Sequence, residues 1–266
     1  LQRIKQMQKR SGIEVSHVMA APHGGCSPEM ANALLQVGFE AATISRWSLM
    51  HHNPTYQWPS TFSLNIGEFL GDAFPIIPRF KLAKEREIDI YLSALLEKPI
   101  IMVGHHDDLR GGLNILAEFA DRINSVGPIK WMDMRSMARS NFCTHEDGDA
   151  LHIKMYSRRV NFLVPSHVKN IYVQRAWLKP DQAETLQWGN ESSGFHIINA
   201  YRAESISVKP NDGIEIASPS AQAIDPGTMP SPRTPVWAAA RRGLCEVRDR
   251  IKPTLDRFGT LRKGGR

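Results

Sequence analysis

The hydrophobic pattern of this chain changes its period near residue 142, and that change constrains the fold more than any other feature. Before it, short apolar runs alternate with stretches in which apolar residues recur at helical spacing. Because strands that alternate with helices pair in parallel, residues 1–144 are predicted to form an α/β domain with a partial, (β/α) barrel-like parallel sheet. After it, short alternating segments lie between turn signals, which predicts a small antiparallel, β-sandwich-like accessory domain over residues 150–218.

The elements expected in the first domain follow from these two periods. Strands are predicted over 13–20, 39–45, 100–103 and 129–134, and helices over 1–11, 28–37, 81–98, 112–127 and 135–142. Ser27 before Pro28 is a helix N-cap signature, and Gly38 is a typical stop. Residues 46–62 are expected to form a long loop, which is uncommon in compact domains and often functional.

A linker and a basic segment close the sequence. Residues 219–233 are rich in proline, serine and alanine, as linkers are. Residues 234–266 are predicted to form a basic amphipathic helix with a tail, because four apolar residues share one helical face: Trp237, Leu244, Val247 and Ile251. This helix either binds an anionic partner or surface, or docks on the chain's own domains through its apolar face.

The net charge of +6 belongs to that tail and not to the body. Residues 233–266 contain ten Lys and Arg against three Asp and Glu, so the other residues balance at minus one, 23 against 24. No basic face interleaved with aromatic residues marks the body, so nucleic acid is not expected as a partner.

Cysteine content and hydropathy limit the remaining classes. Cys26, Cys143 and Cys245 are odd in number and far apart, which fits free thiols better than a disulfide framework or a zinc site. No apolar run approaches the ~18–20 residues of a membrane span, and no signal-peptide pattern is present. The compartment stays open, with the cytoplasm favoured. Because the chain opens without Met on a helical pattern, an N-terminal part is expected to be missing.

Histidines follow two of the predicted parallel strands. His23 lies in the loop "APHGG" after the strand 13–20, and His105 lies in "GHHDD" after the strand 100–103. Because ligand crevices of parallel sheets lie at the carboxyl ends of the strands, both histidines are expected on one rim. The structural alternatives are a tight turn at Pro22–Gly25 and a helix cap by Asp107 or Asp108.

Two tryptophans make a second candidate feature. Trp47 and Trp58 lie in the segment 46–62 and would suit stacking on a sugar ring. An ordered surface loop that uses tryptophan as a hydrophobic anchor is the alternative.

Three other clusters are interpreted more simply. His51, His52, His105 and Asp107 have the donor types for zinc or manganese, but their spacing does not require a site. Residues 145–152, "HEDGDALH", read as an acidic inter-domain turn. Arg158 and Arg159 are expected in structural ion pairs more than in ligand contacts.

Two long segments resemble a known family. "MAAPHGGCSPEMANALLQVGFEAATIS" and "PIIMVGHHDDLRGGLNILAEFADRINSVGPIKWMDM" are similar to the C-terminal half of the catalytic domain in the polysaccharide deacetylase family, carbohydrate esterase family four. The resemblance covers roughly residues 10–142, and the β domain and basic tail lie outside it.

The resemblance implies a metal-dependent hydrolase that removes N- or O-acetyl groups from a carbohydrate substrate. A divalent metal, such as zinc, would be held by an Asp and two His and would activate a water. His105 would be the general acid that protonates the leaving group. The loop of Pro22, His23 and Gly24 would bind substrate and hold the oxyanion through a backbone N–H.

Departures from the family pattern are equally informative. The paired aspartates and the His-x-x-x-His motif of the family have no counterpart here, so the metal ligands are not identified in this chain. Ala20 or Ala21 stands where the family loop has Arg, and His23 stands where it has an aromatic residue. The chain is therefore expected to be a fragment that lacks the metal-binding half of a carbohydrate deacetylase. The alternatives are a non-catalytic carbohydrate-binding protein and a scaffold that acts through the basic C-terminal helix.

Overall fold

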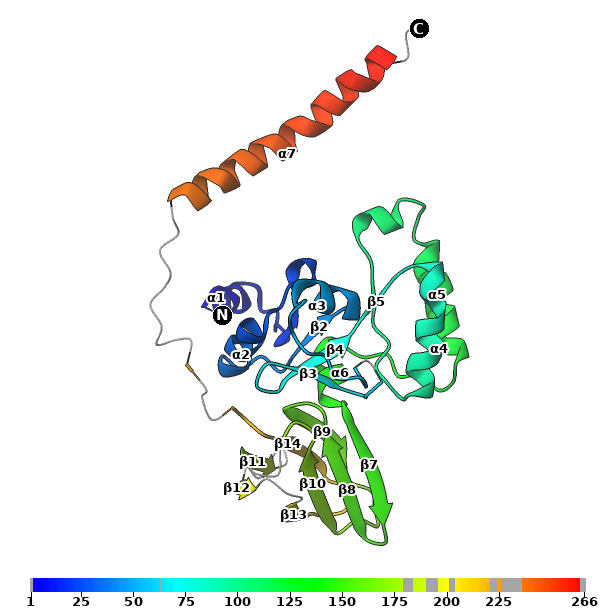
Figure 1. The fold of residues 1–266 in the computed structure, drawn as a ribbon, viewed down its shortest axis with the longest axis vertical. Coiled ribbons are helices and arrows are strands. Elements are labelled where there is room, and N and C mark those ends of the chain that lie inside the picture. The colour runs from blue at the N-terminus through cyan, green and yellow to red at the C-terminus, as the bar shows by residue number, and fades with distance from the viewer. Residues whose placement is uncertain are drawn as a thin grey trace. The chain divides into compact units, whose positions relative to one another are not determined.

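The computed structural model describes residues 2–62, 64–178, 184–189, 196–200, 204–220, 224–225 and 236–263. Residues 3–225 form one compact unit, and residues 226–266 belong to a second. The first unit contains the two sheet-bearing regions that the change of period predicts, and the second contains a single long helix (Figure 1).

The first sheet is mainly parallel, in the order β1-β2-β4-β3. Its strands are β1 (Val18–Ala20), β2 (Ala41–Ile44), β3 (Glu68–Leu70) and β4 (Phe74–Pro78). β1, β2 and β4 run parallel, and β3 pairs with β4 in the antiparallel sense. Every residue of β2 and β4 is buried, as expected for central strands covered on both faces. The observed strand β1 is shorter than the strand predicted over 13–20, and β3 and β4 were not predicted.

The chain passes from this sheet directly into a second parallel pair. β5 (Phe80–Lys81) pairs with β6 (Met102–Val103). The Arg79 N–H donates to the Ile44 carbonyl at 3.4 Å, and the Phe80 N–H donates to the Ile101 carbonyl at 2.8 Å. The segment Phe74–Lys81 thus links β2 on one side to β6 on the other. The α/β class is confirmed, but the strands that the structure describes close no barrel.

Helices surround these strands. They are α1 (Gln2–Ser11), α2 (Pro28–Gln36), α3 (Arg46–His52), α4 (Glu87–Leu95), α5 (Asn114–Ser125) and α6 (Met134–Arg139), with short 3-10 turns η1 (Pro22–Gly24), η2 (Lys84–Arg86) and η3 (His106–Leu109). The predicted cap is confirmed, since the Ser27 side chain accepts a hydrogen bond from the Met30 N–H at 3.2 Å. Gly38, with φ 84°, follows α2.

Three predicted elements are wrong in whole or in part. Residues 46–62 are not all loop, because Ser45 accepts from the Ser48 N–H and caps α3. The predicted helix 81–98 is regular only over α4. The predicted strand 129–134 is irregular, because Asp133 accepts from two N–H groups of the following turn and begins α6 instead.

The C-terminal part of the first unit is a sandwich of two sheets. The sheet orders are β13-β10-β8-β7 and β12-β11-β14-β9. The strands are β7 (Phe142–Asp147), β8 (Ala150–Met155), β9 (Arg159–Leu163), β10 (Asn170–Arg175), β11 (Glu184–Gly189), β12 (His196–Ala200), β13 (Glu204–Ser207) and β14 (Gly213–Ala217). Buried residues from both sheets form one core that includes Ile153, Ile171, Leu186 and Ile216.

Two features of the sandwich differ from its prediction. β8 and β10 run parallel, so the domain is mixed and not purely antiparallel. The predicted inter-domain turn at 145–152 belongs to the hairpin of β7 and β8, in which His145 lies opposite His152 and Gly148 turns the chain at φ 60°. The sandwich consequently begins at Phe142 and not at 150.

Hydrogen bonds from a buried arginine tie the sandwich to the α/β part, and ion pairs hold that arginine and its neighbour within the sandwich. The Arg158 guanidinium, 6% exposed, lies 2.6 Å from Glu184 and donates to the carbonyls of Asp72 and Ala73. Arg159 pairs with Glu215 at 2.7 Å. The prediction of structural ion pairs at both arginines is confirmed.

The described residues of the second unit form α7 (Val236–Lys263). Its apolar residues Trp237, Leu244, Val247 and Ile251 are exposed within this unit. No helix in the described parts of the chain is long and apolar enough to cross a membrane. The predicted linker 219–233 lies mostly outside the described residues.

Candidate functional site

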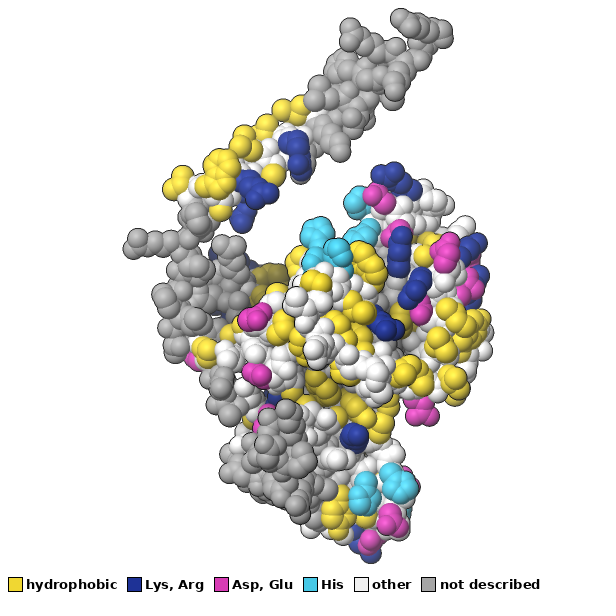
Figure 2. Space-filling view, viewed as in Figure 1, with side chains coloured by type: hydrophobic (Ala, Val, Ile, Leu, Met, Phe, Trp, Pro, Cys, Tyr) yellow, Lys and Arg dark blue, Asp and Glu magenta, His cyan; other side chains and the backbone are white. Residues whose placement is uncertain are grey.

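A cavity of about 770 Å³ lies at the carboxyl ends of the parallel strands, and we name it the rim pocket. The residues that follow β1, β2 and β6 line it, together with Pro78–Lys81 at the junction of β4 and β5 and the inner face of α4. Figure 2 shows histidine side chains over α3 and over the segment that follows β6, with Lys and Arg side chains close to them. The rim predicted from strand order therefore exists, and it is hollow.

The turn that presents His23 is held by a glycine. His23 has φ 53° and Gly24 has φ 71° within η1. A Cβ on Gly24 would lie 2.4 Å from the Cβ of Ser48 in α3, so only glycine allows this approach. The His23 carbonyl lies 3.3 Å from Nε2 of His52. Of the predicted loop residues, His23 lines the rim pocket, while Pro22 and Gly24 shape the turn behind it.

His105 lines the same pocket from the other side. Its N–H donates to Oδ2 of Asp108 at 2.8 Å, which fixes the backbone where β6 gives way to η3. Its neighbour His106 points to solvent, with Nε2 3.2 Å from Asp107. Asp107 also pairs with Arg110 at 2.7 Å, so both aspartates of the motif serve local structure. His23 and His105 thus border one cavity.

The two candidate tryptophans have different positions. Trp47 is 71% exposed, lines the rim pocket and stacks on His51 with ring centroids 4.9 Å apart and planes 6° apart. Trp58 packs against the hydrophobic core, with its centroid 4.4 Å from that of Phe62. The pocket lining includes Trp47 and not Trp58, which fits the hydrophobic-anchor alternative for Trp58.

The lining contains more cationic than acidic side chains, and sequence reasoning missed the cations. They are Arg46, Arg79, Lys81, Arg86 and Lys98, against a single carboxylate, Asp89. Arg46 begins α3 one residue after β2 ends, and Arg79 directly follows β4. A search of the predicted strand ends for cations, and not only for histidines, would have found Arg46 but not Arg79, because β4 was not predicted. The other three lie on elements whose direction the sequence does not show.

Burial lowers the pKa of two of these cations. Desolvation lowers the pKa of Arg79. Desolvation also lowers the pKa of Lys98, Glu68 raises it, and the positive charge of Arg46 lowers it further. The rim pocket therefore holds positive charge in a partly dehydrated setting.

The lining does not fit the divalent metal that the family resemblance implies. Among the described residues, no three His, Cys, Asp or Glu side chains come together as a metal site, so His51, His52, His105 and Asp107 form none. The only carboxylate of the rim pocket, Asp89, lies 2.6 Å from Nε of Arg86. The excess of cationic side chains would also repel a divalent metal ion.

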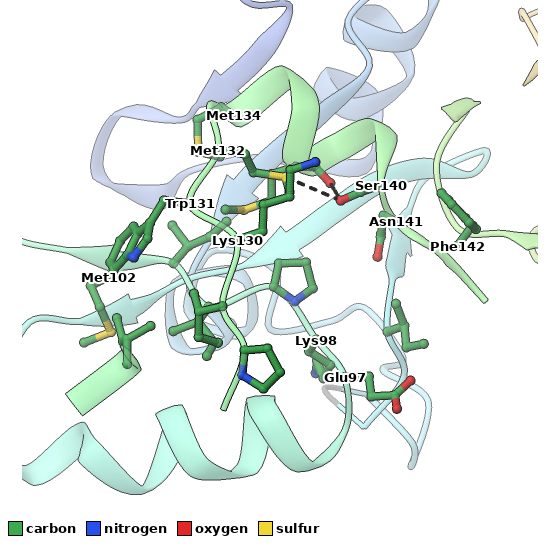
Figure 3. A pocket seen from close by; sticks show the side chains of 18 residues that line it. Glu97, Lys98, Met102, Lys130, Trp131, Met132, Met134, Ser140, Asn141 and Phe142 are labelled. Atoms are coloured by element: carbon green, nitrogen blue, oxygen red, sulfur yellow. Dashed lines mark hydrogen bonds between the residues drawn. The ribbon is translucent and has the colours of Figure 1, made fainter. Parts of the chain in front are cut away.

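A second cavity, of about 360 Å³, lies near the start of β6 and between α5 and α6 (Figure 3). Its lining is apolar and rich in methionine, with Trp131 beside Met102 at one side. Asn141 is 1% exposed, and neither polar atom of its side chain has a hydrogen-bond partner among the described residues.

Comparisons with known protein families, with curated proteins and with solved structures found no match for this chain.

Proposed function

We propose that the rim pocket binds a carbohydrate, and that this chain provides the substrate-binding and proton-donating side of a deacetylase-like hydrolase. The proposal depends on one observation. Three strand-end segments place His23, Trp47 and His105 on a single cavity. A volume of about 770 Å³ lies within the usual range of small-molecule pockets, roughly 300–1,000 Å³.

Each of these groups has a defined role in the proposed reaction. The exposed face of Trp47 stacks on the apolar face of a sugar ring. The backbone of the His23 turn faces the acetyl carbonyl oxygen, where an N–H group stabilises the oxyanion. His105 donates a proton to the leaving nitrogen or oxygen as its bond to the acetyl carbon breaks. Water supplies the hydroxyl that leaves with the acetyl group as acetic acid, and the other proton of that water passes through solvent to His105, which restores the donor.

No step is assigned to a metal, because the described lining does not fit one. The resemblance implies metal ligands and further barrel-forming strands that have no counterpart among the described residues. Carbohydrate binding is consequently the part of the proposal that experiments on this chain alone can test.

Substitution of Trp47 tests carbohydrate binding. We expect Trp47→Ala to weaken binding of N,N′-diacetylchitobiose about tenfold, corresponding to about 1.4 kcal/mol, as measured by isothermal titration calorimetry. Trp131→Ala is the matched control, because Trp131 is also exposed but lines the other cavity. Equal affinities of the two variants, or no binding by the unaltered chain, would contradict the proposal.

A non-catalytic carbohydrate-binding protein is the second candidate, and the lack of a metal-binding cluster among the described residues favours it. Release of acetate from the same sugar, measured with a coupled assay, separates the two. The hydrolase predicts release that His105→Gln abolishes while sugar affinity stays within about twofold. Tight binding without acetate release supports the second candidate.

A further inference from the structure

We infer that the rim pocket contains a phosphate subsite centred on Arg79, so that its ligand is a sugar carrying a phosphate group. The sugar part of this ligand rests on the proposed function, whereas the phosphate part rests on charge and geometry alone. The cations that carry the inference lie at the start of α3, at the junction of β4 and β5, on β5 and after α4, which are separate in sequence but share one cavity.

Three of the five lining cations have no acidic partner among the described residues. Arg86 pairs with Asp89, and Lys98 lies in the field of Glu68. Arg46, Arg79 and Lys81 form no ion pair with any described carboxylate. Elsewhere in the unit, the partly buried Arg139 and the buried Arg158 are paired with glutamates. Within the described part of the chain, Arg46, Arg79 and Lys81 lack the acidic partners that these two arginines have.

Arg79 is the centre of this set. It follows the last residue of the buried strand β4, and its Nε is buried without a hydrogen-bond partner among the described residues. Partial removal of a guanidinium from water without a counter-ion costs free energy, and a bound anion offsets that cost. Its planar fork of N–H groups also matches the oxygens of a phosphate.

Arg46 and Lys98 provide the second argument. The charge of Arg46 is close enough to Lys98 to lower the pKa of its ammonium group. Two cations held together repel each other. An anion bound between them offsets this repulsion, because it attracts both cations. Perturbed groups that converge on a cleft are typical of binding sites.

The amount of unpaired charge favours phosphate over carboxylate. A phosphate monoester carries about −1.5 to −2 at pH 7 and offers three acceptor oxygens, whereas a carboxylate carries one negative charge and two oxygens. Three unpaired cations are balanced better by the phosphate. We therefore expect phosphate to bind more tightly than acetate.

Calorimetry with the full chain tests this directly, with inorganic phosphate and acetate as probes at low ionic strength and pH 7.5. Phosphate is expected to bind at least about tenfold more tightly than acetate. Arg79→Gln is expected to weaken phosphate binding about tenfold or more, since hydrogen bonds to charged groups contribute more than neutral ones. Lys81→Gln, at an exposed position, provides a second variant if Arg79→Gln does not fold.

Arg10→Gln is the matched control, because it removes one exposed positive charge from α1, away from the pocket lining. If it weakens phosphate binding as much as the pocket variants do, the effect is one of net charge and the inference is overturned. Acetate binding that equals phosphate binding, or no phosphate binding at all, overturns it too.

Two sugars separate this inference from the proposed function. N-acetylglucosamine 6-phosphate is expected to bind at least tenfold more tightly than N-acetylglucosamine, and Arg79→Gln should remove the difference. Sugar binding without a phosphate advantage overturns the phosphate subsite and leaves the carbohydrate site. Phosphate binding without any sugar binding supports the subsite and contradicts the proposed function.

Discussion

Gly24 is the residue at which the rim loop and α3 come closest. Its φ of 71° lies in the left-handed region, and a Cβ there would lie 2.4 Å from the Cβ of Ser48. A side chain at position 24 would therefore cost free energy in two ways, through backbone strain and through the collision with Ser48. Both act on the turn that carries His23 into the rim pocket.

Replacement of Gly24 by alanine measures these penalties. Gly24→Ala is expected to lower the free energy of unfolding by about 2–3 kcal/mol, because dihedral strain adds to the collision with Ser48. Gly12→Ala is the matched control, since Gly12 has φ 68° with no atom within 4 Å of an added Cβ, and it should cost about 1 kcal/mol. Urea denaturation gives both values. Equal losses would mean that Ser48 moves aside without cost.

At the scale of elements, local signals predicted the helices best. Ser27 and Gly38 bracket α2, which lies within its predicted range. The strand β4 was missed because Pro75 and Pro78 interrupt the run "FPIIP", and proline is a breaker in most strands. It is nevertheless a central strand, buried along its whole length. Tertiary packing thus overrode the local preference.

The candidate site was also predicted only in part. His23 and His105 were predicted on one rim because carboxyl ends of parallel strands meet at one edge of a sheet. Arg79 escaped prediction because it follows the unrecognised strand β4. Trp58 was assigned to the ligand because hydrophobic anchors and sugar-stacking tryptophans have the same sequence signature. Sequence therefore indicated where the site lies but not its charge.

The N-cap of α6 offers a test at this scale. Asp133 accepts hydrogen bonds from Arg135 and Ser136, and these bonds lower the pKa of its carboxyl group. A lowered folded pKa stabilises the fold above the unfolded value of 3.8, and this contribution is lost as pH falls through the folded pKa. Asp133→Ala should therefore lower the melting temperature at pH 7 and have little effect near pH 2.

The control for this cap is Asp121→Ala, which removes an exposed aspartate from the middle of α5. It should leave the melting temperature within about 1 °C at both pH values, as expected for a surface substitution. A loss in Asp133→Ala that is as large at pH 2 as at pH 7 would show that the charged cap is not its cause.

At the scale of the whole molecule, residues 3–225 behave as one compact unit although their two main cores lie in different parts, one in the α/β part and one in the sandwich. The α/β part and the sandwich share ion pairs that are partly removed from water. Arg139 of α6 binds Glu40 near β2 and Glu215 of β14, and the Glu40 hydrogen bond is the main cause of the raised pKa of Arg139. The apolar face of α7 is exposed. An anionic partner for the basic residues of α7 remains a prediction.

Arg139 is consequently expected to couple the two cores. Arg139→Gln leaves Glu40 without its cation and Glu215 with Arg159 alone, and its cost is expected to be about 2 kcal/mol, below that of a fully buried pair because both carboxylates retain some exposure. Arg110→Gln is the control, since its pair with Asp107 is exposed and should contribute less than about 0.5 kcal/mol.

Calorimetric unfolding should show a single transition for the unaltered unit and for Arg110→Gln. If the cores depend on Arg139 for their coupling, Arg139→Gln lowers that transition or divides it in two. An unchanged single transition would mean that Arg158 and the remaining contacts hold the parts together without it.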